Sequence, residues 1–139
     1  MVDKKKVLKI CNALVKGNLM ETLEIEFVDV GEDFLSARMP VTPKVHQIHG
    51  LLHGGATVAL AETVGSAAVP VLNQDPSISV VGIEISANHL KGVSCGYVTA
   101  TAKPLRMGKT IQLMEIRVTD EEDNLISHCK LSTFSRPLK

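Results

Sequence analysis

The hydrophobic residues at the start of the chain recur at helical spacing, and lysines occupy the opposite face. This pattern predicts a short amphipathic helix over about residues 3–16, ended by Gly17 and Asn18. Its apolar positions are Val7, Ile10, Cys11, Leu14 and Val15. The period then changes, because residues 22–30 alternate apolar and acidic side chains. That alternation predicts a half-buried strand, and residues 34–39 predict the second strand of a hairpin.

An apolar run from residue 56 to about residue 69 predicts one buried helix, which Gly54 and Gly55 precede and Pro70 ends. Four more strands are predicted after it, at residues 77–90, 96–103, 110–119 and 125–134. Consecutive strands joined by short turns usually pair antiparallel. The whole chain, residues 1–139, is therefore predicted to be one α+β domain in which a curled antiparallel sheet buries the apolar helix.

Composition narrows the functional class. Lys and Arg number 15, Asp and Glu number 15, and aromatic residues make up only 3%, so we expect no nucleic-acid partner and no attraction to a membrane. Three cysteines without C-x-x-C spacing are typical of reduced thiols in a cytoplasmic protein. Lysines interrupt the N-terminal apolar residues, so no signal peptide is expected. Glu62, Gly65 and Pro70 argue against a membrane span for the apolar helix.

Glu62 is the first candidate for chemistry. It is the one Asp, Glu, Lys or Arg between Lys44 and Asp75. A carboxylate is almost never buried without a partner, because removing its charge from water is costly. Apolar surroundings also suit a carboxylate to acid–base or nucleophilic work. The alternative is a structural role, in which Glu62 pairs with a Lys or Arg from another strand or projects at an oligomer interface.

Gly54 and Gly55 lie where the apolar helix begins. Free N–H groups and the positive end of the helix dipole can polarise a carbonyl there, although a simple tight turn would also need glycine. Glu62 lies eight residues beyond Gly54, about 12 Å along a helix. A nucleophile and an oxyanion donor must both reach one carbon. Only two copies with antiparallel helices could bring them together, so this chemistry requires a homodimer, with Gly65 and the alanines allowing close helix contact.

Three histidines, His46, His49 and His53, precede the helix at spacings of three and four. They lack the H-E-x-x-H arrangement and a neighbouring carboxylate or Cys, so no metal site is expected. His53 is instead predicted to bond the backbone and help to place the Gly54 amide. Gln47 could donate to a carbonyl or orient a water, or could simply be solvated. Basic residues near the later turns could hold phosphates or be solvated: Lys91, Lys103, Arg106 and Lys109.

Three motifs together resemble a known family. They are L-L-H-G-G-A-T-V-A-L-A-E-T-V-G-S, then V-V-G-I-E-I-S-A-N-H-L, and later P-L-R-M-G-K-T-I-Q. Their order and spacing resemble those of the hotdog-fold acyl-CoA thioesterases over about residues 20–135. The most similar branch holds the phenylacetate-pathway thioesterases, the Arthrobacter-type 4-hydroxybenzoyl-CoA thioesterase and dihydroxynaphthoyl-CoA hydrolase.

The resemblance implies a hotdog fold, dimers that assemble as homotetramers, and active sites between subunits. The position of Glu62 matches the catalytic carboxylate, either nucleophile or general base, and the Gly54 amide would polarise the thioester carbonyl. Gln47 and His53 match supporting positions, and Ser66 matches a residue that positions water. The coenzyme A site would comprise Gly82, His89, Leu90, Lys91, Gly92, Arg106, Met107, Gly108, Lys109 and Thr110.

The implied reaction is hydrolysis of an acyl-CoA to an acid and free coenzyme A, with no metal or organic cofactor. Two alternatives stay open, a non-catalytic acyl-CoA-binding hotdog module and a hotdog enoyl-CoA hydratase or dehydratase. Ile48 and His49 stand where relatives often carry an aromatic residue or Pro-Phe, and Tyr97 is the single tyrosine. The acyl group is therefore left open between aromatic and aliphatic.

Overall fold

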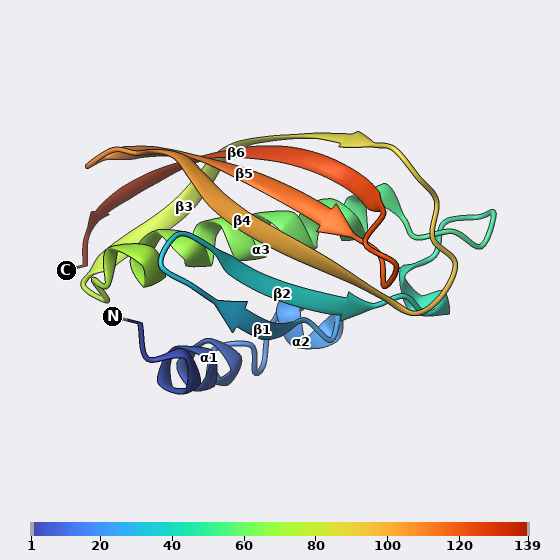
Figure 1. The fold of residues 1–139 in the computed structure, drawn as a ribbon, viewed down its shortest axis with the longest axis horizontal. Coiled ribbons are helices and arrows are strands. Elements are labelled where there is room, and N and C mark those ends of the chain that lie inside the picture. Colours follow the sequence, from blue (N-terminus) through green and yellow to red (C-terminus); the bar gives the residue numbers. More distant parts are fainter. Residues whose placement is uncertain (1, 139) are drawn as a thin grey trace.

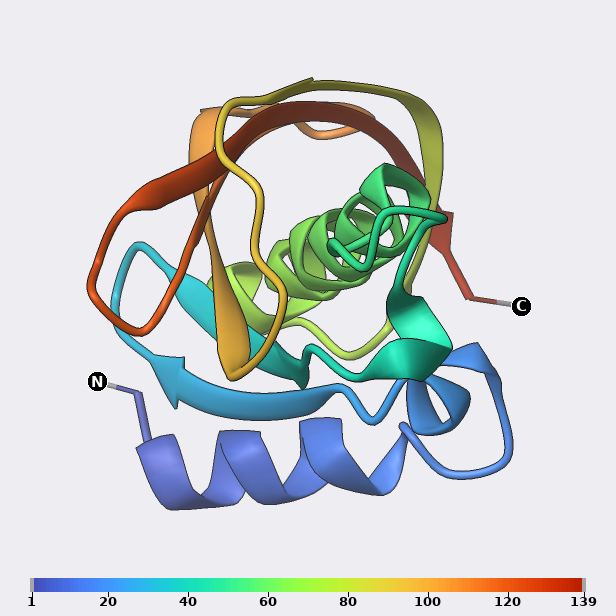
Figure 2. The same cartoon turned by 90° about the vertical axis from the view of Figure 1, so that its right-hand side faces the viewer.

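One antiparallel sheet of six strands curls around one long helix, as the end-on view in Figure 2 shows. The computed structural model describes residues 2–138. The strand order across the sheet is β1-β2-β4-β5-β6-β3. The helices are α1 (Lys4–Ala13), α2 (Leu19–Thr22) and α3 (Gly54–Asn73), with a 3-10 turn at Pro43–Val45. The strands are β1 (Glu26–Val30), β2 (Leu35–Pro40), β3 (Ile78–His89), β4 (Tyr97–Met107), β5 (Ile111–Thr119) and β6 (Leu125–Pro137). The predicted α+β architecture and order of elements are confirmed.

The core forms between α3 and the concave face of the sheet. Alternate residues of β5 face inward, so Met114, Ile116 and Val118 are fully buried while their neighbours face out. Leu60 and Val64 of α3 are fully buried too. Each such side chain stabilises the fold by about 1.5–3 kcal/mol through loss of apolar surface to water. Helix α3 has the length and apolarity of a membrane span, but here it is the core helix of the sheet.

Gly65 serves this core and not a helix of another subunit, which corrects one expectation. It is buried on the face of α3 that meets the sheet. A Cβ at this position would come within 2.6 Å of Leu131 Cδ2 and 3.2 Å of Ile116 Cδ1. Glycine is therefore needed because the helix backbone lies directly on β5 and β6.

Helix α3 is longer than predicted at both ends. The prediction that Pro70 ends it was wrong, since the helix continues to Asn73. Pro70 removes one hydrogen bond near the last turn, but the following residues still find partners. The helix ends where Gln74 takes a left-handed φ of 52°, and the Asp75 N–H donates to the Pro70 carbonyl at 3.0 Å.

Three strand boundaries differ from prediction by three residues or more, and one of them is the end of β6, which continues beyond residue 134 to Pro137. β1 begins at Glu26, not at residue 22, because residues 19–22 form the short helix α2 with Asn18 as its N-cap. β4 continues beyond residue 103 to Met107. Pro104 is tolerated there because the pairing with β5 has an irregularity between Pro104 and Arg106.

The two edge strands of the sheet, β1 and β3, differ in what lies against them. Helix α1 lies along β1 (Figure 2). Asn12 fixes it there, because its side-chain amide donates to the Phe27 carbonyl at 3.0 Å and its side-chain oxygen accepts from the Phe27 N–H at 2.8 Å. The opposite edge is β3, which pairs with β6 on one side only in the described chain.

Candidate active site

Glu62 lies in the middle of α3 and faces the start of β3. Gly82 of β3 lies against its carboxylate, since a Cβ at Gly82 would come within 2.5 Å of Glu62 Oε2. Within residues 2–138 no salt bridge or side-chain hydrogen bond involves Glu62. A structural ion pair within this chain therefore does not explain the carboxylate, and it remains available for chemistry.

A cleft of about 660 Å³ opens beside this carboxylate, and we call it the Glu62 cleft. Ser66, one turn further along α3, shares its wall with Glu62, as the sequence predicted. Helices α1 and α2 and the first residues of β3 supply the other walls. The lining residues are Cys11, Leu14, Asn18, Leu19, Met20, Phe27, Ala59, Glu62, Thr63, Ser66, Ala67, Pro70, Ile78 and Val80.

His53 is the N-cap of α3, which fits the role predicted for it at the start of the helix. Its ring Nδ1 accepts a hydrogen bond from the Gly55 N–H at 2.8 Å, and its own N–H donates to the Val45 carbonyl at 2.8 Å. The Gly54 N–H donates in no hydrogen bond found within residues 2–138. The helix thus begins with one free amide at the positive end of its dipole, a group suited to polarise a carbonyl.

A second cleft of about 350 Å³ surrounds this amide, and we call it the Gly54 cleft. It brings together six residues predicted for the site from three separate segments: Gln47, Gly54, His89, Leu90, Lys91 and Gly92. Its remaining lining residues are Leu51, Leu52, Thr57 and Ile126.

Gln47 enters this cleft with its orientation fixed. Its side-chain oxygen accepts from the backbone N–H groups of His49 and Leu51. The amide NH2 group is then the part left to act on a ligand, because an amide carries its donors on nitrogen. This supports the predicted role of Gln47 as a donor.

His89 packs directly on the first residue of α3. A Cβ at Gly54 would lie 2.7 Å from His89 Nε2. The other ring nitrogen, Nδ1, lies 3.0 Å from Ser127 Oγ, and that hydroxyl donates to the Asn88 carbonyl at 3.2 Å. With its proton directed to that carbonyl, Ser127 Oγ offers an acceptor to His89 Nδ1, an arrangement that suits the tautomer with the proton on Nδ1 and leaves Nε2 toward the cleft.

Lys91 is held at the rim of the Gly54 cleft. Its Nζ lies 3.1 Å from Asp120 Oδ2. Hydrogen bonds from the Asn124 side chain and backbone, together with that from Lys91, hold the pKa of Asp120 far below its usual range. Asp120 is therefore ionised at neutral pH and keeps Lys91 pointing along this edge.

The histidines before α3 have separate partners. His46 Nε2 lies 2.9 Å from the Ser94 carbonyl, and His53 caps the helix. No group of three or more His, Cys, Asp or Glu side chains in the described part of the chain is placed to hold a metal ion.

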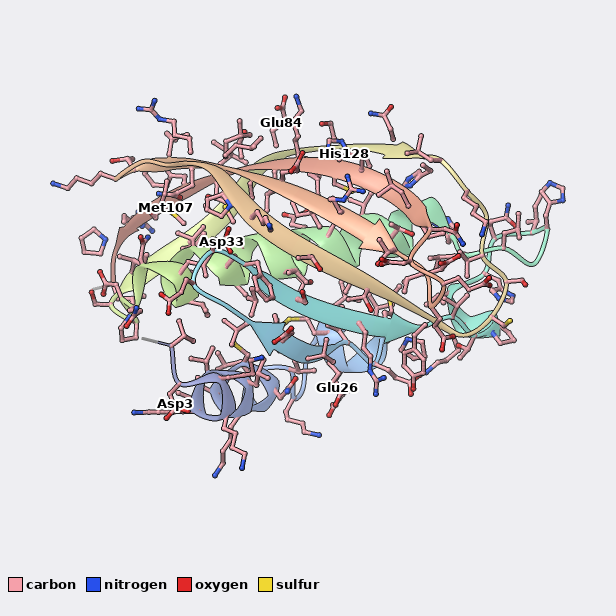
Figure 3. The ribbon with its side chains drawn as sticks, viewed as in Figure 1. Asp3, Glu26, Asp33, Glu84, Met107 and His128 are labelled. Atoms are coloured by element: carbon pink, nitrogen blue, oxygen red, sulfur yellow. The ribbon has the colours of Figure 1, made fainter. Side chains whose placement is uncertain are left out.

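The structure separates other predicted residues. The two clefts share no lining residue, so Glu62 and Gly54 do not meet within one chain. Residues 106–110, the end of β4 and the turn that follows it, lie at the end of the sheet where α3 ends, as the position of Met107 in Figure 3 shows. The Gly54 cleft surrounds the first residue of α3, and α3 begins at the opposite end of the sheet (Figure 1). Gly82 lies against Glu62 and lines neither cleft.

Sequence reasoning missed two polar residues, Thr57, which lines the Gly54 cleft, and Ser127, which contacts the His89 ring behind it. Thr57 is only 2% exposed, and its hydroxyl takes part in none of the hydrogen bonds found within residues 2–138. Its position one turn after Gly54 was a usable signal. Ser127 is remote in sequence from His89, so no local pattern could have indicated that it orients the ring.

Comparisons with known proteins agree with this arrangement. Residues 49–127 match the model of the Thioesterase superfamily. The chain is 45% identical over 126 residues to the proofreading thioesterase EntH of Cronobacter turicensis, covering 91% of each chain. It is 40% identical over 134 residues to 1,4-dihydroxy-2-naphthoyl-CoA hydrolase of Escherichia coli, covering 96% of this chain and 98% of that one. A thioesterase structure from Haemophilus influenzae superposes with a TM-score of 0.90 at 40% identity, covering 94% of this chain and 91% of that one.

Proposed function

The chain belongs to the Thioesterase superfamily and is a thioester hydrolase, and we propose that it cleaves acyl-CoA at an active site shared by two subunits. This proposal depends on one observation, that Glu62 and Gly54 line separate clefts of the chain. A second subunit is therefore needed to bring the two groups together. The hydratase and the non-catalytic binding module are not supported, because the relatives are named as thioesterases and hydrolases.

The proposed reaction needs only water as co-substrate. A water oxygen bonds to the acyl carbon, the C–S bond breaks, and R–CO–S–CoA plus water gives R–COO⁻, a proton and CoA–SH. Glu62 either takes the proton from the attacking water or attacks the carbon itself to form a mixed anhydride that water then opens. The Gly54 N–H and the Gln47 amide stabilise the negative charge that develops on the carbonyl oxygen. His53 holds the Gly54 turn in place, and Ser66 positions the water beside Glu62.

The free edge of β3 supports the dimer. This strand is twelve residues long and offers unpaired backbone N–H and C=O groups, with Val81 54% and Ile83 56% exposed. Two copies that pair through β3 would place two α3 helices antiparallel, because the pairing axis is twofold. Glu62 of one subunit would then approach Gly54 of the other.

The same dimer would complete the coenzyme A site. The basic turn at residues 106–110 and the Gly54 cleft lie at opposite ends of one chain. Antiparallel subunits would bring the turn of one beside the cleft of the other. Arg106 and Lys109 would then bind phosphates while His89, Lys91 and Gly92 line the path of the pantetheine arm.

We also propose a homotetramer of two such dimers in the cytoplasm, acting without a cofactor. Leu105 and Ile111 are 54% and 46% exposed, which leaves apolar surface for a further contact between copies. All three cysteines are free thiols, as suits a reducing compartment.

The decisive test is free-thiol release from acyl-CoA by wild type and by Glu62→Gln. We expect the variant to lose a factor of about 100 or more in kcat, since an acid–base or nucleophilic group contributes at least that much. Glu84→Gln is the matched control, because Glu84 projects from the outer face of the sheet (Figure 3). Equal turnover in wild type and Glu62→Gln would refute the role assigned to Glu62.

A further inference from the structure

The inward-facing positions of β5 change from apolar to polar beside the basic turn at residues 106–110. Met114 and Ile116 are apolar and fully buried, but Gln112, the next inward position toward the turn, is also only 1% exposed. An apolar side chain there would fill the same space and leave no polar group to satisfy. The buried amide therefore has to be explained by what it binds.

The Gln112 amide is bonded on both of its polar atoms. Its Nε2 donates to the Gly108 carbonyl at 2.7 Å and to Ser135 Oγ at 2.9 Å. Its Oε1 accepts from the Thr133 hydroxyl at 2.7 Å. Because the Gly108 carbonyl can only accept, the nitrogen must face the turn, and the orientation of the amide is fixed.

This network reaches every carbonyl of the three residues that join β4 to β5, residues 108–110. Ser135 Oγ donates to the Lys109 carbonyl at 3.1 Å, and the Ser135 N–H donates to the Thr110 carbonyl at 2.8 Å. With the Gln112 bond to Gly108, all three carbonyls are held toward buried side chains. A satisfied buried network of this kind favours one conformation of the chain.

The other side of these peptide groups is open. In a trans peptide the N–H points away from the C=O of the preceding residue, so the N–H groups of Lys109 and Thr110 point away from the network. Neither N–H donates in a hydrogen bond found within residues 2–138. Arg106 and Lys109 are exposed, and neither forms a salt bridge within the same residues.

We infer that Gln112 is a positioning residue for the phosphates of coenzyme A. Together with Ser135 it holds the turn in the conformation that presents the Lys109 and Thr110 N–H groups to a phosphate, while the cationic side chains of the turn supply charge. This rests on the proposed function, since it takes the turn as the place where the phosphates bind. A turn that is already ordered costs less free energy to bind than one that must be ordered by the ligand.

The first measurement compares kcat/KM for the same acyl group on coenzyme A and on pantetheine, which lacks the phosphates and the adenosine. Benzoyl and octanoyl thioesters of both carriers are used. Gln112→Met should lower kcat/KM for the acyl-CoA about tenfold more than for the acylpantetheine, because the released turn no longer presents its N–H groups. Ser135→Ala, which removes one bond of the network, should do so about fivefold. An unchanged ratio in both variants would overturn the inference.

Ser36→Ala is the matched control. Ser36 and Ser135 are both 5% exposed, and the Ser36 hydroxyl bonds Thr101 Oγ1 at 2.8 Å, between β2 and β4 and away from the turn. The control loses a buried hydroxyl bond of the same kind and should keep the wild-type ratio. Ser135→Ala also keeps the test decisive if Gln112→Met fails to fold. An equal fall of the ratio in Ser36→Ala and Ser135→Ala would show a general loss of stability and overturn the inference.

Calorimetry with free coenzyme A separates this inference from the proposed function, because it needs no turnover. About fivefold weaker binding by Ser135→Ala, with Ser36→Ala unchanged, supports the inference even if wild type hydrolysed no acyl-CoA, and only the proposed hydrolysis would then fail. Equal binding by wild type, Gln112→Met and Ser135→Ala would overturn the inference alone. If wild type did not bind coenzyme A, the proposed phosphate site would be wrong, and the inference with it.

Discussion

Glycine is required at position 82 because the Glu62 carboxylate lies against it, and not because of its own backbone angles. A methyl group there would come within 2.5 Å of Glu62 Oε2, and within 3.3 Å of Leu131 Cδ1 on the other side. Since Leu131 is fully buried, the carboxylate has to move. Displacing a reacting group by about 1 Å can cost about a hundredfold in rate.

We therefore expect Gly82→Ala to lower kcat by about ten- to a hundredfold while the fold is retained. Steady-state kinetics with far-UV circular dichroism checks this. Gly17→Ala is no suitable control, because its φ of 79° would add backbone strain. Ser79→Ala, earlier on the same strand and outside both clefts, serves instead. An active Gly82→Ala enzyme would mean that Glu62 does not need its present position.

Thr57 offers the second test at this scale. Its side chain is buried, it lines the Gly54 cleft, and its hydroxyl takes part in none of the hydrogen bonds found in residues 2–138. Thr57→Val keeps the shape and removes the hydroxyl. We expect about a tenfold lower kcat/KM with unchanged or greater stability, as for a polar group kept for a ligand. Thr99→Val, on β4 and outside both clefts, should change neither activity nor stability. A fall in stability without loss of activity in Thr57→Val would indicate a structural hydroxyl.

The sequence alone could nominate most residues of the candidate site but not how these residues contact one another. Glu62 was indicated because it is isolated among apolar residues, and Gly54 because it begins the helix. The contact between Gly82 and Glu62 joins a helix to a strand, and that between His89 and Gly54 joins a strand end to a helix start. Such contacts depend on how the sheet curls, which no local pattern encodes.

At the scale of elements, periodicity predicted every strand and both longer helices. Predicted boundaries were wrong where tertiary packing or strand pairing overrode the local preference of a single residue. Pro70 was expected to end α3, but Val71 and Leu72 pack against the core and the helix continues to Asn73, where the left-handed Gln74 ends it. β4 was predicted to end at residue 103, but it continues through Pro104 because a bulge accommodates the proline. Helix α2 is four residues long, too short for a period to be recognised.

Helix α1 provides a prediction at this scale. The Asn12 side chain of this helix makes two hydrogen bonds to the backbone of Phe27, at 3.0 and 2.8 Å. Asn12→Ala leaves a strand N–H and a carbonyl without these partners. We expect the free energy of unfolding to fall by about 1–3 kcal/mol, measured by urea denaturation at fixed protein concentration.

The control for α1 is Asn73→Ala at the exposed end of α3, which should change stability by less than about 0.5 kcal/mol. Equal losses in the two variants would show that the Asn12 bonds contribute nothing beyond helix propensity.

For the whole molecule, the question is whether one chain can carry a complete site. Glu62 and Gly54 lie on one rigid helix, about 12 Å apart along its axis, and in separate clefts. No loop movement can bring them together, because both belong to the same run of helical hydrogen bonds. Either Gly54 is not the carbonyl-polarising group, or a second subunit supplies it.

Mixed dimers distinguish these two cases. Glu62→Gln removes the carboxylate, and Gly54→Val disrupts the other half-site, because its side chain would meet His89. Each variant alone should be nearly inactive. In a mixed dimer, the intact Glu62 of one subunit faces the intact Gly54 of its partner, so one of two sites is restored. Random assembly makes about half of all dimers mixed, so co-expression should recover about a quarter of wild-type turnover. If differently tagged mixed dimers were purified and stayed inactive, the shared site would be wrong, and Gly54 would not be the group that polarises the carbonyl.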